Sequence, residues 1–163
     1  MIERKYLAHF IDASFGGTTA NYVRLGSDLE ELNEELSPNI TTINNILGET
    51  RVRNTGYTTT TAVSPFFAEY DDALTEKIWD IVNKRLTGDE CRTTAVDVLL
   101  RPPVTEGGTP TVVHAYKRDV YISVDTSGGN TDGVQVPFTM NDEGTPVRVN
   151  FNMSTNTVTP FTS

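Results

Sequence analysis

Cysteine is nearly absent from this sequence of 163 residues, and long apolar runs are absent altogether. The single cysteine, Cys91, cannot form an internal disulfide bond, which fits folding in a reducing cytoplasm. No apolar run reaches the length of about 18 residues that a membrane-spanning helix needs, so we expect no membrane segment. His9 and Asp12 interrupt the apolar stretch near the N-terminus, so we expect no secretory signal.

Basic residues are also scarce. The chain has 13 lysines and arginines against 22 aspartates and glutamates, which gives a formal net charge of −9. Proteins that bind nucleic acid do so mainly through phosphate contacts from clustered lysine and arginine. The acidic balance therefore argues against a DNA-binding module. It is compatible with a conduit through which DNA passes without adhering.

Catalytic and cofactor-binding motifs are missing as well. The two histidines, His9 and His114, have no second ligand at metal-binding spacing. The patterns Gly-x-Ser-x-Gly, Gly-x-x-x-x-Gly-Lys-Ser/Thr and Gly-x-Gly-x-x-Gly do not occur. Cys91 follows two acidic residues, which raise the pKa of a thiol rather than activate it. The sequence therefore predicts no catalytic residue, no metal site and no cofactor, and it favours a binding or structural role.

An acidic block contains Asp28, Glu30, Glu31, Glu34 and Glu35 with no basic residue between them. One interpretation is a set of paired carboxylates for catalysis or for calcium. Because no base accompanies them, we favour a solvated or interface-lining acidic face.

The secondary structure of the same stretch, residues 27–36, is ambiguous. Ser27 or Asp28 would cap a helix whose three leucines share one face. The alternation of leucine and glutamate equally allows a strand that ends at Pro38. Periodicity alone leaves both possibilities open.

Most of the remaining chain has a β pattern, rich in threonine, and its length suits one domain over residues 1–163. Turns or bends are predicted at Gly48 and Gly56, and turns at 127–130 and 141–144. The Ser/Thr/Asn-rich residues 152–163 are predicted to form a flexible C-terminal tail. Strands are predicted over residues 5–12, 22–25, 43–63, 95–100, 120–124, 134–138 and 147–151.

One helix is predicted from Asp71 or Asp72 to Leu86, with Gly88 closing it. Trp79 lies within it, and we expect this side chain to pack rather than to bind a ligand. The expected fold is a β sandwich or barrel that carries one mid-chain helix. The apolar stripe that packs the helix on the sheet consists of Leu74, Ile78, Ile81, Val82 and Leu86.

Three groups of residues occur in a distinctive order and spacing. The first is Asp-Leu-Glu-Glu-Leu-Asn-Glu-Glu-Leu-Ser-Pro-Asn at 28–39, with Asn-Ile-Leu-Gly-Glu-Thr at 45–50 and Thr-Gly-Tyr at 55–57. The second is Asp-Asp-Ala-Leu-Thr-Glu-Lys-Ile-Trp at 71–79, which runs into Leu-Thr-Gly-Asp at 86–89. The third is Val-Gln-Val-Pro-Phe at 134–138, with Gly144 and the closing Pro-Val-Arg-Val-Asn-Phe at 146–151. Together they span nearly the whole chain and resemble the tail tube (major tail) proteins of long-tailed bacteriophages and of related defective tails in Gram-positive bacteria.

The resemblance implies a tail tube fold of two packed β sheets flanked by a helix, with residues 27–36 as a strand that leads into a long loop and hairpin. It implies a non-enzymatic subunit whose six copies form a ring, and rings that stack into a channel for double-stranded DNA. The implied partners are further copies of the chain and the tail tip, tail terminator and tape measure proteins. The implied location is the tail of the virion, after synthesis in the host cytoplasm.

Residues 38–50 are mostly polar with scattered apolar side chains, a composition that suits an arm better than a core. The family that the chain resembles has its ring-stacking loop here. The resemblance therefore implies contacts between rings from Asn39, Thr41, Asn44, Asn45 and Leu47.

Three other interpretations stay open. A tube subunit of a contractile tail or of a phage-tail-like bacteriocin would share the fold. A stand-alone β-sandwich module that binds carbohydrate or protein would normally show clustered exposed aromatics, and Trp79 is the only tryptophan. A small hydrolase is disfavoured by the missing motifs.

Overall fold

The computed structural model describes residues 1–27 and 29–162, and these residues are mainly β with one α-helix. The order along the chain is η1 (Arg4–Tyr6), β1 (Leu7–Asp12), β2 (Tyr22–Leu25), β3 (Glu34–Glu35), β4 (Pro38–Asn44), β5 (Thr50–Tyr57), β6 (Thr60–Val63), α1 (Ala73–Lys84), η2 (Gly88–Cys91), β7 (Arg92–Arg101), β8 (Thr111–Ser123), β9 (Gly128–Asn130), β10 (Gly133–Gln135), β11 (Phe138–Asn152) and β12 (Thr157–Pro160).

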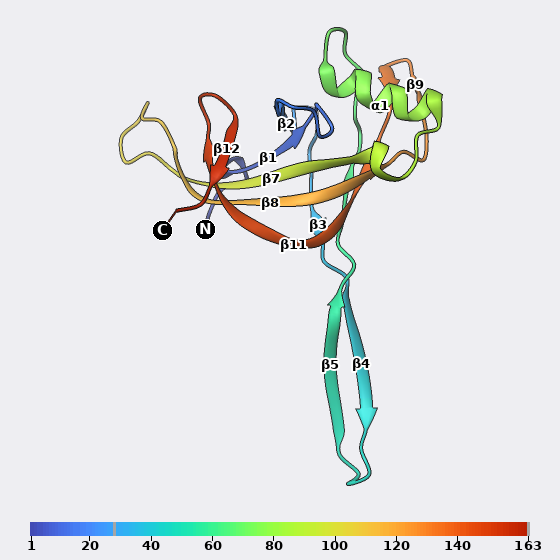
Figure 1. Ribbon diagram of the computed structural model, residues 1–163. Helices are drawn as coiled ribbons and strands as arrows, with labels where there is room; N and C mark the ends of the chain where they lie inside the picture. Colours follow the sequence, from blue (N-terminus) through green and yellow to red (C-terminus); the bar gives the residue numbers. More distant parts are fainter. Residues whose placement is uncertain (28, 163) are drawn as a thin grey trace.

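A curled antiparallel sheet forms the body of the molecule (Figure 1). Its strands follow the order β2-β1-β7-β8-β11-β6-β3, and β12 pairs with the end of β11. Two hairpins, β4–β5 and β9–β10, are two-stranded sheets of their own. The β-rich fold class with a single helix is therefore confirmed for the described residues, in the form of one strongly curved sheet.

The sheet buries apolar side chains on both faces, because successive side chains of a strand point in opposite directions. On β1, Ile11 packs in a cluster with Leu74 and Ile78 of α1. The neighbouring Phe10 faces the other way and packs with Phe151 of β11, with 4.6 Å between the ring centroids. The helix thus covers one face, and the curled end of β11 with β12 covers the other.

The helix begins where it was predicted to begin. Asp72 accepts a hydrogen bond from the backbone N–H of Leu74 at 3.3 Å, which satisfies one of the free donors of the first turn. The predicted closure at Gly88 is wrong. Arg85 ends the helix in the left-handed conformation (φ 52°, ψ 47°), and Gly88 begins the short η2 turn instead.

The predicted apolar stripe of α1 faces the sheet, and Leu74, Ile78 and Ile81 are buried. The expectation for Trp79 is wrong, because this residue is 45% exposed. One residue along a helix is a rotation of about 100°, so Trp79 stands to the side of the stripe that contains Ile78.

The turn predicted at residues 141–144 is wrong. These residues lie inside β11, which continues through a bulge between Glu143 and Val147. Gly144 has a φ of +74°, a conformation that glycine adopts without strain and that suits a bulge as well as a turn. As a consequence, Asp142 stays on a strand of the sheet and its side chain is buried.

Several other predictions need smaller corrections. Residues 128–130 of the predicted turn form β9, so the chain reverses after Asn130. The strand predicted over 134–138 is divided between β10 and β11. Within the range predicted as a flexible tail, residues 157–160 form β12.

The helix considered for residues 27–36 does not form in the described part of that stretch, which contains only the short strand β3. The cap considered at Asp28 lies outside the described residues. The two residues of β3 pair with β6, with Glu34 opposite Thr61 and Glu35 opposite Thr60. This short strand connects the body to the segment that follows.

Candidate assembly interface

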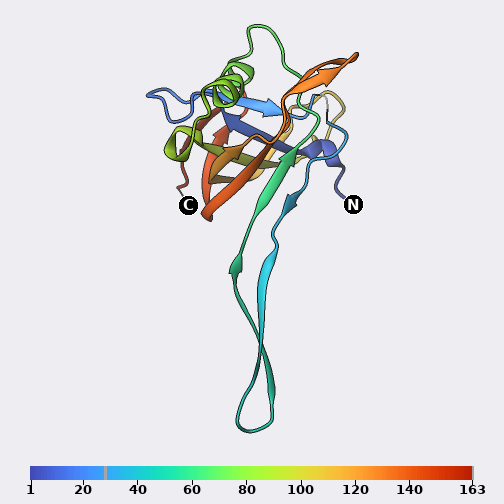
Figure 2. The ribbon, with the colours of Figure 1, turned by 90° about the vertical axis from the view of Figure 1, so that its right-hand side faces the viewer.

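Strands β4 and β5 form a long hairpin that projects from the body, as both views show (Figures 1 and 2). We call residues 38–57 the arm. Every residue of the arm except Asn45 and Gly56 is exposed. Neither face of the arm is covered by the other residues that the structure describes, although the hairpin carries several large apolar side chains.

The turn of the arm is built by Asn45. Its side-chain oxygen accepts hydrogen bonds from the backbone N–H groups of Leu47 and Glu49, at 3.0 and 2.9 Å. Gly48 has a φ of +78°, so it supplies the left-handed conformation that closes the loop. The turn predicted at Gly48 is confirmed, and Ile46 and Leu47 are left exposed at the tip.

Residues opposite each other in an antiparallel pair share a face. The two faces of the arm that are defined in this way differ in charge. The uncharged face consists of Ile40, Thr42 and Asn44 opposite Asn54, Val52 and Thr50. The other, which we call the basic face, consists of Thr41 and Ile43 opposite Arg53 and Arg51.

The five residues proposed from the resemblance are therefore all in or beside the first half of the arm, but they have different surroundings. Thr41 lies on the basic face, Asn44 on the uncharged face and Leu47 at the tip. Asn45 shapes the turn. The backbone oxygen of Asn39 accepts a hydrogen bond from the Thr55 hydroxyl at 3.0 Å.

The sequence-based prediction of the interface omitted the residues of β5, although the strand register places them on the same two faces of the arm as the residues of β4. Strand alternation across a predicted hairpin was the signal that would have found Arg51, Val52 and Arg53. The arm contains two basic residues and one acidic residue, a formal charge of +1, within a chain of −9. The rest of the molecule therefore carries −10.

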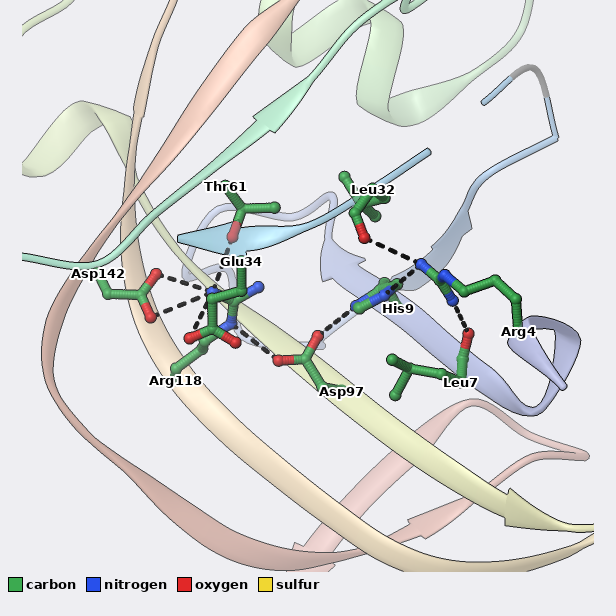
Figure 3. A network of polar contacts seen from close by, with 9 residues as sticks. All are labelled: Arg4, Leu7, His9, Leu32, Glu34, Thr61, Asp97, Arg118 and Asp142. Atoms are coloured by element: carbon green, nitrogen blue, oxygen red, sulfur yellow. Dashed lines mark hydrogen bonds and ion pairs between the residues drawn. The ribbon is translucent and has the colours of Figure 1, made fainter. Parts of the chain in front are cut away.

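At its base the arm is held by β3 and β6, and a group of polar side chains that ranges from buried to partly exposed lies beneath these two strands (Figure 3). We call it the root cluster. One residue comes from each of six neighbouring strands: His9 (β1), Asp97 (β7), Arg118 (β8), Asp142 (β11), Thr61 (β6) and Glu34 (β3).

Arg118 is the centre of the root cluster, and its side chain is only 2% exposed. Its Nη1 lies 2.9 and 3.1 Å from the two carboxylate oxygens of Asp142 and 3.2 Å from the hydroxyl of Thr61. The same atom lies 3.5 Å from Glu34 Oε1. One guanidinium group therefore contacts both strands from which the arm extends, because Glu34 precedes the arm and Thr61 follows it.

Asp97 joins this centre to His9. Its Oδ2 lies 3.1 Å from Arg118 Nε, although the N–H is not aligned for a hydrogen bond. Its Oδ1 accepts a hydrogen bond from His9 Nδ1 at 2.6 Å. On the far side of the ring, Arg4 Nη2 lies 3.0 Å from His9 Nε2 and 3.1 Å from the backbone oxygen of Leu32.

Burial raises the pKa of the Glu34 carboxyl and that of the Asp142 carboxyl, and the positive charge of Arg118 opposes both shifts without cancelling them. The Glu34 side chain is 29% exposed and that of Asp142 is 6% exposed. Glu30, Glu31, Glu34 and Glu35 are all exposed residues, as expected for an acidic face, although the Glu34 side chain is partly covered because it lies beside Arg118. Asp28 lies outside the described residues.

The other candidate groups lie apart from the arm. His114 is exposed on β8. Cys91 is buried, and its thiol donates a hydrogen bond to the backbone oxygen of Leu86 at 3.3 Å. Burial raises the thiol pKa, and the charge of Glu90 raises it further, in the direction that the sequence predicted. Within residues 1–27 and 29–162, no group of three or more His, Cys, Asp or Glu is placed to hold a metal ion.

In the part of the chain that the structure describes, no helix is long and apolar enough to cross a membrane. Comparison with known proteins adds no relative from which a site could be transferred. No protein-family model matches the sequence, and no curated protein matches it with significant similarity.

Proposed function

We propose that this protein is a structural subunit of a bacteriophage tail tube, and that it acts by self-assembly without catalysis or a cofactor. Six copies form a ring, and rings stack into a channel that double-stranded DNA passes during ejection. The observation that carries the proposal is the arm, a hairpin that leaves the body and exposes both of its faces.

The physical chemistry of the arm supports a role in assembly. A lone two-stranded hairpin is marginally stable in water, because it has no third strand and no packed face. The arm nevertheless exposes Ile40, Ile46, Leu47 and Val52. Covering one such side chain fully contributes about 1.5–3 kcal/mol. The more of these four side chains a partner covers, the more strongly the arm favours association.

The charge distribution favours a second copy of the chain as that partner. The arm carries +1 and the rest of the molecule −10, so the arm of one copy is attracted to the body of another. Two bodies without arms would repel each other. We propose that arms extend from each ring to the next and hold the stack together.

Ring closure would also protect the edges of the sheet. The strand order ends at β2 on one side and at the two-residue strand β3 on the other. Unpaired strand edges promote uncontrolled aggregation, whereas closing strands into a continuous barrel removes the edges. An acidic channel wall would let DNA pass without gripping its phosphates.

The remaining parts of the proposal follow from the tail tube assignment. The partners at the ends and inside of such a tube are the tail tip, tail terminator and tape measure proteins, and the location is the virion tail. A tube of a contractile tail or of a phage-tail-like bacteriocin uses the same assembly. The presence or absence of a sheath-protein gene beside this one distinguishes them.

One observation favours a different class of function. Trp79 is exposed on α1, and an exposed tryptophan suits a stand-alone module that stacks against a sugar or a protein. Glycan-array and pull-down binding that is abolished by Trp79→Ala, in a protein that stays monomeric, would support this module.

Electron microscopy of the purified protein at high concentration tests the main proposal. We expect six-fold rings or tubes, with growth accelerated by a tail-tip nucleator. Light scattering on the same samples measures the concentration dependence. A protein that stays monomeric at every concentration, with and without the nucleator, would refute the tail tube assignment.

A further inference from the structure

A cleft of about 510 Å³ lies between the C-terminal half of α1, the short turn η2 and the end of β8. We call it the helix-end cleft. Its rim includes one exposed residue of each charge, Arg85 and Asp125. Its apolar lining belongs to the margin of the core cluster under the helix, and consists of Ile81, Val82, Leu86, Ile122 and Val124.

The tip of the arm has the same pairing of apolar and charged groups. Ile46 and Leu47 are 103% and 76% exposed, and they are neighbours in the turn. Glu49 and Arg51 follow them, with 3.6 Å between Glu49 Oε2 and Arg51 Nη2. Two large apolar side chains therefore stand beside one charge of each sign. Moving such side chains from water into an apolar cleft is favourable.

The end of the body that contains the helix-end cleft is strongly acidic. Residues 69–90 and 121–135 contain nine aspartates and glutamates against three lysines and arginines, a formal charge of −6. This is more than half of the −10 that the whole body carries. The arm carries +1, so its attraction to another copy is directed mainly toward this end.

Two other clefts suit the arm less well, because their charge has the wrong sign. Lys117 and Arg148 line a cleft beside β12, and Arg4, Lys5 and Arg24 line a cleft near the N-terminus. Basic side chains outnumber acidic ones in the described lining of both. They would repel the two arginines of the arm.

The cleft and the tip lie at opposite ends of the molecule. In both views, α1 and the β9–β10 hairpin are at the end of the body away from the tip of the arm (Figures 1 and 2). The tip of one copy therefore cannot reach its own cleft and can only enter that of another copy. A contact between two different surfaces of the same protein is heterologous, and it repeats as an open stack when no rotation closes it.

We propose that Ile46 and Leu47 at the tip of the arm dock in the helix-end cleft of a second copy of the chain, with Arg51 facing Asp125. This inference rests on the proposed role of the arm in self-assembly and names the surface that receives it. Docking needs two copies and no ring, so it is tested separately from tube formation.

Disulfide trapping between two differently tagged copies tests the docking directly. Both carry Cys91→Ser, one carries Leu47→Cys, and the other carries Thr126→Cys in the lining of the cleft. A disulfide bond requires Cα atoms within about 7 Å, so docked copies are the ones that form it efficiently.

The matched control for the trap replaces Thr126→Cys with Thr105→Cys, an exposed residue in the loop that precedes β8, whereas the cleft lies at the end of that strand. We expect the mixed disulfide to form about tenfold faster with Thr126→Cys than with Thr105→Cys, because docking raises the local concentration of the two thiols. Equal rates would overturn the proposal.

A charge exchange tests the orientation of the docked tip. Arg51→Asp in the copy that donates the arm should slow the trap, because it places two carboxylates together. Asp125→Arg in the receiving copy should then restore most of the rate. A rate that stays low in the exchanged pair would show that these two residues do not face each other.

Two assembly-defective variants provide a test without cysteines. Ile46→Asp with Leu47→Asp damages the tip and leaves the cleft intact. Thr126→Arg with Ser127→Arg obstructs the cleft and leaves the arm intact. All four residues are exposed, so denaturant unfolding of both variants should match wild type. Neither variant should elongate alone, whereas their mixture should form single docked pairs, of chains or of rings, and stop there. Analytical ultracentrifugation measures the sizes.

The outcomes distinguish the docking site from the tail tube assignment. A mixture that stops at two stacked rings supports both. A mixture that stops at pairs of single chains, with the mixed disulfide and no rings in any sample, supports the docking and refutes the tail tube. Wild-type tubes from the variant with the obstructed cleft, without the mixed disulfide, support the tube and overturn the docking site. No association in any sample overturns both.

Discussion

The arm and the body have the same secondary structure but opposite surroundings. In β7 of the body, only the two end residues of ten are exposed, and five of the others are buried. In β4 of the arm, all seven residues are exposed. Backbone pairing is thus sufficient to define a strand, but it does not define what stabilises it. The body is stabilised by two apolar clusters, whereas the arm depends on its turn, its root and whatever covers it.

This contrast predicts that removing the arm abolishes assembly and leaves the body folded. Residues 40–54 can be replaced by a short Gly-Ser linker, because Asn39 and Thr55 are already bonded across the hairpin. We expect unchanged circular dichroism per body residue and no tubes in electron microscopy. The same linker in place of the exposed residues 104–107 is the matched control and should allow tubes. Normal tubes from the armless variant would remove the arm from the assembly mechanism, and an unfolded monomer would show that it belongs to the core.

A charge introduced in the body should be far more damaging than the same charge in the arm. Ile78 is completely buried beneath the sheet, so Ile78→Asp places an unpaired carboxylate in the core and should cost about 4 kcal/mol or more. Ile43→Asp changes an exposed arm residue and should cost no more than about 0.5 kcal/mol. Denaturant unfolding measures both. Equal losses would show that the arm is part of the folded core.

The root is where the two regions meet, and Arg118 should behave as a body residue. Arg118→Met leaves the buried carboxylates without their cation and should cost about 3 kcal/mol at neutral pH. Arg53→Met, on the basic face of the arm, should change monomer stability by less than about 0.5 kcal/mol. Thermal or denaturant unfolding of the two variants, side by side, gives the comparison. A neutral effect of Arg118→Met would mean that the root cluster does not stabilise the fold.

Polar substitutions at the arm tip should separate assembly from folding on a finer scale. Ile46 and Leu47 are exposed and make no contact with the core clusters. Replacing both with serine should leave the unfolding midpoint unchanged. It should raise the protein concentration needed for tubes by about tenfold, equivalent to about 1.4 kcal/mol of lost apolar contact. An unchanged threshold would place the contact elsewhere on the arm.

Periodicity in the sequence was sufficient to predict the helix and parts of several strands of the body. The stripe of Leu74, Ile78 and Ile81 predicted the helix face, and alternation around Val120 and Ile122 predicted an inward-facing strand. The bulge of β11 could not be distinguished from a turn, because Gly144 and its polar neighbours are typical of both. That single ambiguity turned one strand of fifteen residues into a predicted hairpin.

The root cluster escaped prediction because its members are far apart in the sequence and each looks ordinary alone. Arg118 stands between a lysine and an aspartate and resembles a solvated charge. Its position, however, has the same parity as Val120 and Ile122, so alternation already places it inside. Glu34 has a weaker signal of the same kind, since it shares the parity of the buried Leu32 in a stretch whose period also allowed a helix. Which carboxylates meet the buried arginine depends on the curl of the sheet, a property of the whole fold.

The smallest effect is expected at Cys91, a buried residue of the body to which no reaction is assigned. Its thiol is buried and donates to the Leu86 backbone oxygen, a bond that a serine hydroxyl can also make. Cys91→Ser should therefore cost less than about 1.5 kcal/mol and leave tube formation intact. Because the raised pKa and burial both suppress the thiolate, a thiol reagent should react much faster with unfolded than with native protein. A Cys91→Ser variant that folds but does not assemble would instead assign the thiol a role at an interface.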